Sequence, residues 1–321
     1  MYLTFYGLRE KPFNTTPDPR FLYLTRSHRE ALAQLTYSVK DNRGFLVLTG
    51  EAGTGKTTLV RTLLERLDAE TAVSLVFNSS LPFDGILEYV LHDLGVECPA
   101  GETRAQRLIR LNELLIGRRR TGQRTILIID EAQNLAVETL EQIRLLSNFE
   151  TPRDKLLQIL LIGQPELDTT LRLSQLRQLA QRIELQHQIS PLSRAETSTY
   201  ILARLRVAGA RQSPFSARAI ARIAGAAGGI PRRVNILCEH CLVIGYAEQR
   251  RSIEPDIVRQ AVAAFASPSR PQSLKPAATR LTWAIGVMVV ALLGGIAALP
   301  LRFETTPLAN LARAARELLV R

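Results

Sequence analysis

The chain has 321 residues, of which 46% are hydrophobic, and it carries a formal net charge of +11. This length and apolar content are enough for about two packed domains and exclude a disordered chain, while three scattered cysteines exclude a disulfide framework. The charge indicates an anionic partner, either nucleic acid or anionic lipid head groups, without choosing between them.

The first strong pattern is a buried strand followed by a glycine-rich turn and a helix. Residues 45–49 are apolar or β-branched, and the sequence then reads G-x-x-x-x-G-K-T. Glycines let successive backbone N–H groups face a phosphate, and the N-terminus of the following helix adds positive charge. Lys56 would add a point charge, and the Thr57 hydroxyl would bind Mg²⁺. The pattern predicts a phosphate-binding loop made of Gly50, Glu51, Ala52, Gly53, Thr54, Gly55, Lys56, Thr57 and Thr58.

Further apolar runs predict the remaining strands. They cover residues 72–77, 125–130 and 157–163, and they alternate with amphipathic segments of helical period. This alternation predicts an α/β fold with a parallel sheet covered by helices on both faces. A fifth strand is predicted at residues 182–189, where the period-2 pattern indicates a more exposed edge.

Polar residues follow two of these runs. Asp130 would hold the Mg²⁺ shell through water, and Glu131 would orient or deprotonate an attacking water, which indicates hydrolysis. Gln164 directly follows the fourth run, where it would sense the γ-phosphate or position the water. The residues leave a simpler alternative open, because Gly163 and Pro165 are also typical of a strand-end turn.

From residue 193 onward the pattern becomes helical. Ser193 and Glu196 predict a capping box that opens a helix. Further helices are predicted from Ser216 to a pair of glycines, from Pro231, and from residue 254 or 255 to about 265. The predicted organisation is an ATPase core over residues 1–190 and a small helical lid over residues 191–266.

The last part of the chain differs in composition. Residues 267–280 are basic and rich in Pro and Ser, which predicts a linker. Residues 281–301 carry no charge and are long enough to cross about 30 Å of hydrocarbon, which predicts one transmembrane helix. Flanking basic residues and the need for cytoplasmic nucleotide place the preceding domains in the cytoplasm. Residues 302–321 form a short tail with apolar residues at helical spacing.

Together these motifs resemble a known family. Residues 50–58, 127–133, 162–167 and 229–235 look like those of AAA+ ATPases of the general secretion pathway A (ExeA-like) group, and residues 6–13 resemble its opening. The resemblance implies a P-loop AAA+ sheet flanked by helices, a helical lid, and ATP and Mg²⁺ as cofactors. It also implies a homo-oligomeric ring in which each active site borrows an arginine from its neighbour.

The resemblance assigns roles within the nucleotide motifs. Lys56 and Thr57 match the first motif, and Asp130 and Glu131 match the second. Gln164 matches the first sensor. The implied catalytic residues are Glu131, Lys56, Gln164 and a borrowed arginine, with Thr57 and Asp130 at the metal.

Outside these motifs the resemblance implies four further assignments. Arg232 matches the lid arginine that senses nucleotide. Arg182 best matches the arginine that acts on a neighbouring subunit, with Arg177 second. Asn78 matches a position that holds the catalytic glutamate inactive until a partner binds, and residues 21–25 fall where family members contact the adenine.

The sequence thus predicts an ATPase anchored in the inner (cytoplasmic) membrane by a single span. It would drive assembly or remodelling of a cell-envelope complex of the type II secretion or pilus type. The alternative from another class is a DNA-associated AAA+ regulator of the transposition-accessory type, favoured by the positive charge and opposed by the predicted span. A non-hydrolysing nucleotide-gated scaffold is opposed by Glu131 and Lys56.

Overall fold

The computed structural model describes residues 1–14, 18–21, 23–77, 80–152 and 154–266. Contacts group this part into one compact unit, Met1–Ala266. The predicted linker, transmembrane helix and tail at 267–321 lie outside the described residues, as does Asn78. Within the part of the chain that is described, no helix is long and apolar enough to cross a membrane.

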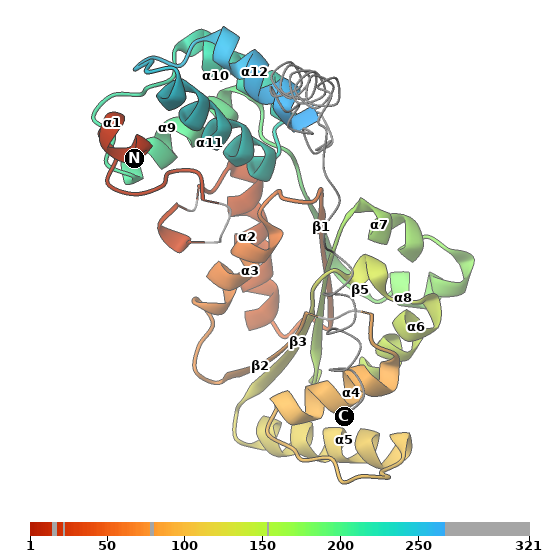
Figure 1. Cartoon of the computed structure of the whole chain (residues 1–321). Helices are drawn as coiled ribbons and strands as arrows, with labels where there is room; N and C mark the ends of the chain where they lie inside the picture. Colours follow the sequence, from red (N-terminus) through yellow and green to blue (C-terminus); the bar gives the residue numbers. More distant parts are fainter. Residues whose placement is uncertain (15–17, 22, 78–79, 153, 267–321) are drawn as a thin grey trace, which may run out of the picture. The chain divides into compact units, whose positions relative to one another are not determined.

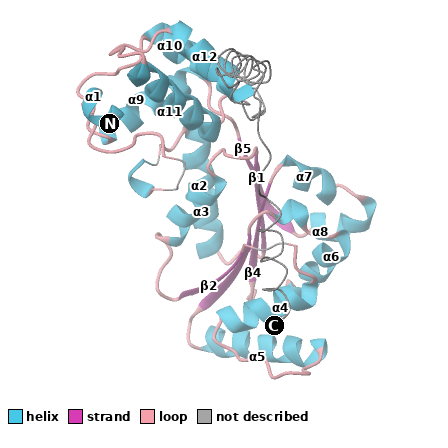
Figure 2. Cartoon of the chain, viewed as in Figure 1, coloured by secondary structure: helices cyan, strands magenta, loops and turns pink. Residues whose placement is uncertain are grey.

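A parallel β-sheet forms the centre of the first part of the unit (Figure 2). Its five strands, in the described residues, pair in the order β2-β3-β4-β1-β5, and every neighbouring pair is parallel, which confirms the predicted α/β sheet. Exposure alternates along β5 at the edge of the sheet, as its period-2 pattern predicts. The strands are β1 (Phe45–Gly50), β2 (Thr71–Val76), β3 (Arg124–Ile129), β4 (Gln158–Gly163) and β5 (Ile183–Ile189).

Helices cover both faces of the sheet because side chains alternate along each strand (Figure 1). In β1, Leu46 and Leu48 pack with α2 and α3, whereas Phe45 and Val47 pack with α4 to α8. Both faces are therefore dry. The helices are α2 (Arg26–Lys40), α3 (Lys56–Leu64), α4 (Phe83–Asp93), α5 (Arg104–Arg120), α6 (Val137–Leu146), α7 (Pro165–Leu171) and α8 (Arg177–Ala180), with 3-10 turns η1 (Pro19–Phe21), η2 (Ala132–Asn134) and η3 (Ser174–Leu176).

The second part of the unit is helical, as predicted. The Ser193 hydroxyl accepts the Glu196 backbone N–H while the Glu196 side chain accepts the Ser193 backbone N–H, which confirms the capping box. The other predicted starts are also confirmed, because Ser216 caps the second of these helices and Pro231 opens the third. The helices are α9 (Arg194–Val207), α10 (Ala217–Ala227), α11 (Pro231–Ala247) and α12 (Pro255–Ala266).

The N-terminal residues pack on these helices and not on the sheet. The short helix α1 (Tyr2–Phe5) contacts α11, and the Tyr2 hydroxyl donates to the Glu239 carboxylate at 2.7 Å. Leu8 and Phe13 are buried in the same hydrophobic cluster as α9 to α12. The sequence placed this segment in the core range 1–190, whereas its apolar contacts are with the helical part.

The turn before α11 lies directly against the segment that leads into α9, and Gly229 makes the contact. The Leu192 N–H donates to the Gly229 carbonyl at 2.8 Å. Gly229 has a φ of 73°, and a Cβ there would lie 2.1 Å from the Leu192 carbonyl oxygen. Gly228, with a φ of 60°, has open space around the same position. The close backbone approach therefore requires glycine at 229 but not at 228.

These neighbours form a matched pair for a stability measurement. Gly228→Ala should cost about 1 kcal/mol of unfolding free energy, because alanine is strained at positive φ. Gly229→Ala carries the same strain plus a clash with backbone that cannot turn aside, so it should cost at least about 2 kcal/mol more. Urea unfolding of a version ending at Ala266 checks this. Equal losses for the two variants would contradict the close approach.

Candidate nucleotide-binding site

The predicted phosphate loop connects the end of β1 to the start of α3. Gly53 and Gly55 have φ values of 84° and 103°, a region that side chains rarely adopt. A Cβ on Gly53 would lie 2.6 Å from the Cβ of Arg232. The loop is thus folded tightly against the start of α11, and Lys56 is the first residue of α3. Backbone N–H groups at a helix N-terminus are suited to binding an anion.

Lys56 lies inside this loop. Its Nζ donates to the carbonyls of Gly50 at 2.6 Å and Glu51 at 3.2 Å. Burial lowers the pKa of Lys56, and the carboxylates of Glu131 and Asp130 act in the opposite direction. The ammonium group is therefore held where a phosphate oxygen would replace the two carbonyls as its partner.

Thr57 and Asp130 meet beside the loop. The Thr57 hydroxyl donates to Asp130 Oδ2 at 3.1 Å, and Asp130 Oδ1 accepts the Glu131 backbone N–H at 2.9 Å. Hard cations such as Mg²⁺ prefer oxygen ligands of this kind. No group of three or more His, Cys, Asp or Glu that could hold a metal occurs among the described residues, so the remaining ligands for Mg²⁺ would come from nucleotide and water.

Two glutamine side chains converge on the Glu131 carboxylate. Gln133 Nε2 donates to Glu131 Oε2 at 2.7 Å, and Gln164 Nε2 approaches the same oxygen at 3.4 Å. Gln133 Oε1 also accepts the Gln164 backbone N–H at 3.0 Å. Glu131 has a φ of 54°, which is strained for a non-glycine residue and is found most often where function requires it.

Gln133 is a residue that the sequence reading did not assign to the site. Its signal is the sequence D-E-A-Q at the end of the third strand, which places it two residues after Glu131. Gln164, which the sequence left between a sensor and a turn, occupies the N-cap position of α7 without a side-chain capping bond, and its side chain reaches Glu131. Its position therefore satisfies the local turn and leaves the side chain at the site.

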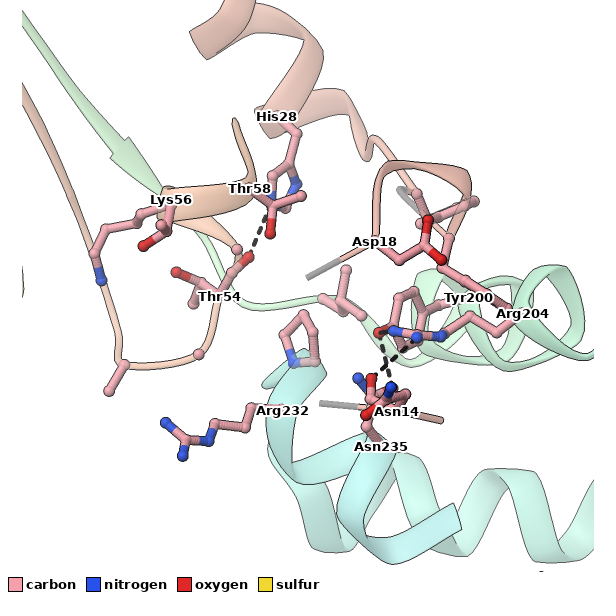
Figure 3. Close-up of a pocket in the computed structure, with 18 of the residues that line it drawn as sticks. Asn14, Asp18, His28, Thr54, Lys56, Thr58, Tyr200, Arg204, Arg232 and Asn235 are labelled. Carbon is pink, nitrogen blue, oxygen red and sulfur yellow. Dashed lines mark hydrogen bonds between the residues drawn. The ribbon is translucent and has the colours of Figure 1, made fainter. Parts of the chain in front are cut away.

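A cavity of about 400 Å³ extends from the loop toward the helical part. Figure 3 shows its lining, with the phosphate loop on one side and α9 and α11 on the other. The Arg232 N–H donates to the Gly53 carbonyl at 3.3 Å, and its exposed side chain extends past the loop. Phe21 and Tyr23, from the segment predicted to contact adenine, line the same cavity.

A buried arginine on α9 organises the far end of this cavity. Arg204 is 7% exposed. Its guanidinium donates to the Pro12 carbonyl at 2.6 Å, the Tyr200 hydroxyl at 2.7 Å and the Asn14 carbonyl at 3.2 Å. It also lies 4.9 Å from the centre of the Phe21 ring. These contacts attach the N-terminal segment to α9, and a lone arginine in a helical pattern gave no signal for them.

The predicted borrowed arginines are remote from the loop. Arg182 precedes β5, where its Nη1 donates to the Ser147 hydroxyl at 2.6 Å. Since β5 is parallel to β1, this end of the strand is separated from the loop end by about 20 Å at about 3.3 Å per residue. Arg177 is exposed at the start of α8. Neither arginine is among the residues that line the cavity at the loop of its own chain.

Comparisons with known proteins agree with this geometry. Residues 39–171 match the family described as AAA domain. Over 255 residues the chain is 42% identical to General secretion pathway protein A of Aeromonas hydrophila. The aligned region covers 79% of this chain and 46% of that protein. The chain thus spans about half the length of this relative.

Solved structures support the same fold. The Aeropyrum pernix ORC2 protein, in ADPNP and ADP complexes, has 20% identity and a TM-score of 0.62, with 82% of this chain and 74% of that chain covered. Cdc6p from Pyrobaculum aerophilum has 21% identity and a TM-score of 0.60, with 78% and 69% covered. At such identities the likeness concerns the fold alone.

The buried arginine gives a stability prediction with a control on the same helix. Arg204→Met should lower the free energy of unfolding by about 3 kcal/mol, because it removes the guanidinium that donates to the buried Pro12 carbonyl and Tyr200 hydroxyl. Arg206→Met, at an exposed position of α9, should change it by less than about 0.5 kcal/mol. Urea unfolding, with limited proteolysis of the N-terminal segment, measures both effects. Similar losses in the two variants would contradict the role of Arg204.

Proposed function

The chain belongs to the AAA+ ATPases of the general secretion pathway A (ExeA-like) family, and we propose that it hydrolyses ATP at the loop of residues 50–58. The observation that carries this proposal is the convergence of three strand ends. Lys56 follows β1, the Asp130–Glu131 pair follows β3, and Gln164 follows β4. All three strands are parallel, so these side chains meet where the C-terminal ends of the strands lie side by side.

Each side chain has a definite task in this proposal. Lys56 exchanges its loop carbonyls for the β- and γ-phosphate oxygens. The Thr57 hydroxyl would bind Mg²⁺ and Asp130 would hold its shell through water, and their mutual hydrogen bond fits this arrangement. When bound, the metal neutralises negative charge on the phosphate oxygens. Glu131 orients the attacking water and accepts its proton.

The two glutamines hold this base in place. Gln133 donates the shorter hydrogen bond to Glu131, and Gln164 the longer. We assign Gln133 to orienting the carboxylate and Gln164 to the γ-phosphate, because the longer bond is the easier one to exchange. When nucleotide binds, the Gln164 side chain would turn from Glu131 to the γ-phosphate, and Gln133 would continue to orient the Glu131 carboxylate toward the attacking water.

Completion of the site requires a second copy of the chain. Arg182 lies at the opposite end of β5 from its own loop, so it serves an active site only when another subunit presents that site to it. A homo-oligomeric ring satisfies this requirement at every interface. Arg177 is the second candidate for this role. Arg232 would report nucleotide to the lid, because its backbone is bonded to Gly53.

We propose that this ATPase works on a cell-envelope assembly of the secretion or pilus type. The 42% identity to General secretion pathway protein A supports that setting. The uncharged segment 281–301 supports a single-span anchor in the inner membrane with the ATPase part in the cytoplasm. ATP hydrolysis would then drive assembly or remodelling of the complex.

The DNA-associated alternative is not favoured. Helix α5 carries the densest basic run of the described part, and such a run could track a phosphate backbone if its charges were free. Several of its arginines are instead neutralised within the chain. The ion pairs of this helix are Arg104–Asp84, Arg107–Glu88, Arg110–Glu102 and Arg119–Asp154.

Glu131→Gln tests hydrolysis directly. It should lower ATP turnover by about 100-fold or more, because a general base contributes at least that much, while ATP still binds. Phosphate release and retention of labelled ATP measure the two effects. Glu138→Gln, at an exposed position of α6, should leave turnover unchanged. Full turnover by the Glu131 variant would remove its assigned role.

The setting of the enzyme is tested by stimulation of turnover. Full-length protein and a version ending at Ala266 are compared with anionic vesicles, with duplex DNA, and with neither. The membrane proposal expects stimulation by vesicles in the full-length protein alone, because the version ending at Ala266 lacks residues 267–321, which include the basic segment and the uncharged segment 281–301. Stimulation of both versions by DNA would instead support the DNA-associated reading.

A further inference from the structure

A buried histidine outside the nucleotide motifs contacts the phosphate loop. His28 lies in the first turns of α2, which Thr25 caps, and it is 4% exposed. Figure 3 shows its ring directed at Thr54, with a hydrogen bond between them. Neither strand nor loop patterns in the sequence drew attention to this position, and the mechanism proposed above does not use it.

The hydrogen bonds of His28 assign one tautomer to its neutral ring. Nε2 lies 2.9 Å from the Thr54 carbonyl oxygen, and because a carbonyl can only accept, Nε2 must donate. Nδ1 lies 2.6 Å from the Thr25 hydroxyl, which already accepts the His28 backbone N–H at 3.2 Å. In a neutral ring Nδ1 accepts, so the Thr25 hydroxyl donates to it. Burial lowers the pKa of His28 and favours this neutral form.

The peptide that His28 holds is part of the phosphate-binding surface. The Thr54 carbonyl and the Gly55 N–H belong to one planar trans peptide and point in opposite directions. Fixing the carbonyl toward His28 therefore turns the Gly55 N–H toward the other side of the loop. A Cβ on Gly55 would lie 3.4 Å from His28 Nε2, so the ring packs directly against this peptide.

We propose that His28 is a positioning residue for phosphate binding, which it supports by holding the Thr54–Gly55 peptide with its N–H facing the phosphates. The Thr25 hydroxyl fixes the orientation of the His28 ring through its hydrogen bond to Nδ1. Without the bond, this peptide is free to turn and to present a carbonyl oxygen to an anion, which is repulsive. The inference rests on the proposed nucleotide site. His28 would affect binding of the phosphate chain and not of the adenine.

The test compares two substitutions of His28 in the full-length protein. His28→Gln places an amide N–H₂ group within reach of the Thr54 carbonyl, whereas His28→Leu has no donor. The dissociation constants of ATP and of inorganic tripolyphosphate are measured by calorimetry. His28→Leu should weaken both ligands by the same factor, about tenfold for one lost hydrogen bond. His28→Gln should stay within about threefold of the wild type, whereas a purely volume-filling role would give the two variants similar dissociation constants.

A second histidine and a second pair of variants keep the test sharp. His187 bonds α2 through Gln34 and does not line the cavity, so His187→Leu should leave both dissociation constants unchanged. If His28→Leu does not fold, Thr25→Val and Thr25→Ser replace it. Thr25→Val removes the hydroxyl that fixes the ring and should weaken tripolyphosphate, whereas Thr25→Ser should restore binding.

The outcomes separate this inference from the proposed function. Wild-type affinity of His28→Leu for tripolyphosphate would overturn the role of His28, and so would weakening of ATP alone, because that would place His28 at the nucleoside. Binding of neither ATP nor tripolyphosphate by the wild-type chain would overturn the proposed function itself.

Discussion

The parallel direction of the strands is the constraint on which the site depends. The C-terminal ends of β1, β3 and β4 lie side by side along one edge of the sheet, because these strands are parallel. One loop and two short turns therefore bring Lys56, Glu131 and Gln164 together at this edge. Each of these strands is buried on both faces, so the edge is held by a dry core on either side. Polar groups are then carried at the strand ends, where they do not interrupt that core.

Close backbone contacts connect this edge to the helical part. The loop touches α11 through the Arg232 N–H and the Gly53 carbonyl, and within the helical part Gly229 lies directly against Leu192. Neither approach leaves room for a side chain. These contacts therefore hold the phosphate loop close to the start of α11 through backbone atoms, which cannot rotate away as side chains do.

The sequence was sufficient for features determined by local pattern. Apolar runs located the strands, and Ser193 with Glu196 located a helix start. Gly50 to Thr58 carried their own motif. The roles of Arg204 and His28 were not predictable, because each depends on partners that are distant in the chain and that only the fold brings near. The packing of Leu8 and Phe13 on α9 to α12 has the same cause.

The arginines show why net charge was a weak guide to partners. Arg204 is buried and donates its hydrogen bonds to neutral oxygens of its own chain. Arg104 and Arg119 of α5 form ion pairs with carboxylates. The formal charge of +11 is the difference between 41 Lys and Arg and 30 Asp and Glu, so it does not say which of the cations are buried, paired or exposed. The fields of Arg104 and Arg119 are largely compensated at close range by their carboxylate partners, and the guanidinium of Arg204 is buried. The charge offered to a partner is therefore decided by burial and local pairing, and Arg232 is an arginine that is exposed beside the phosphate loop.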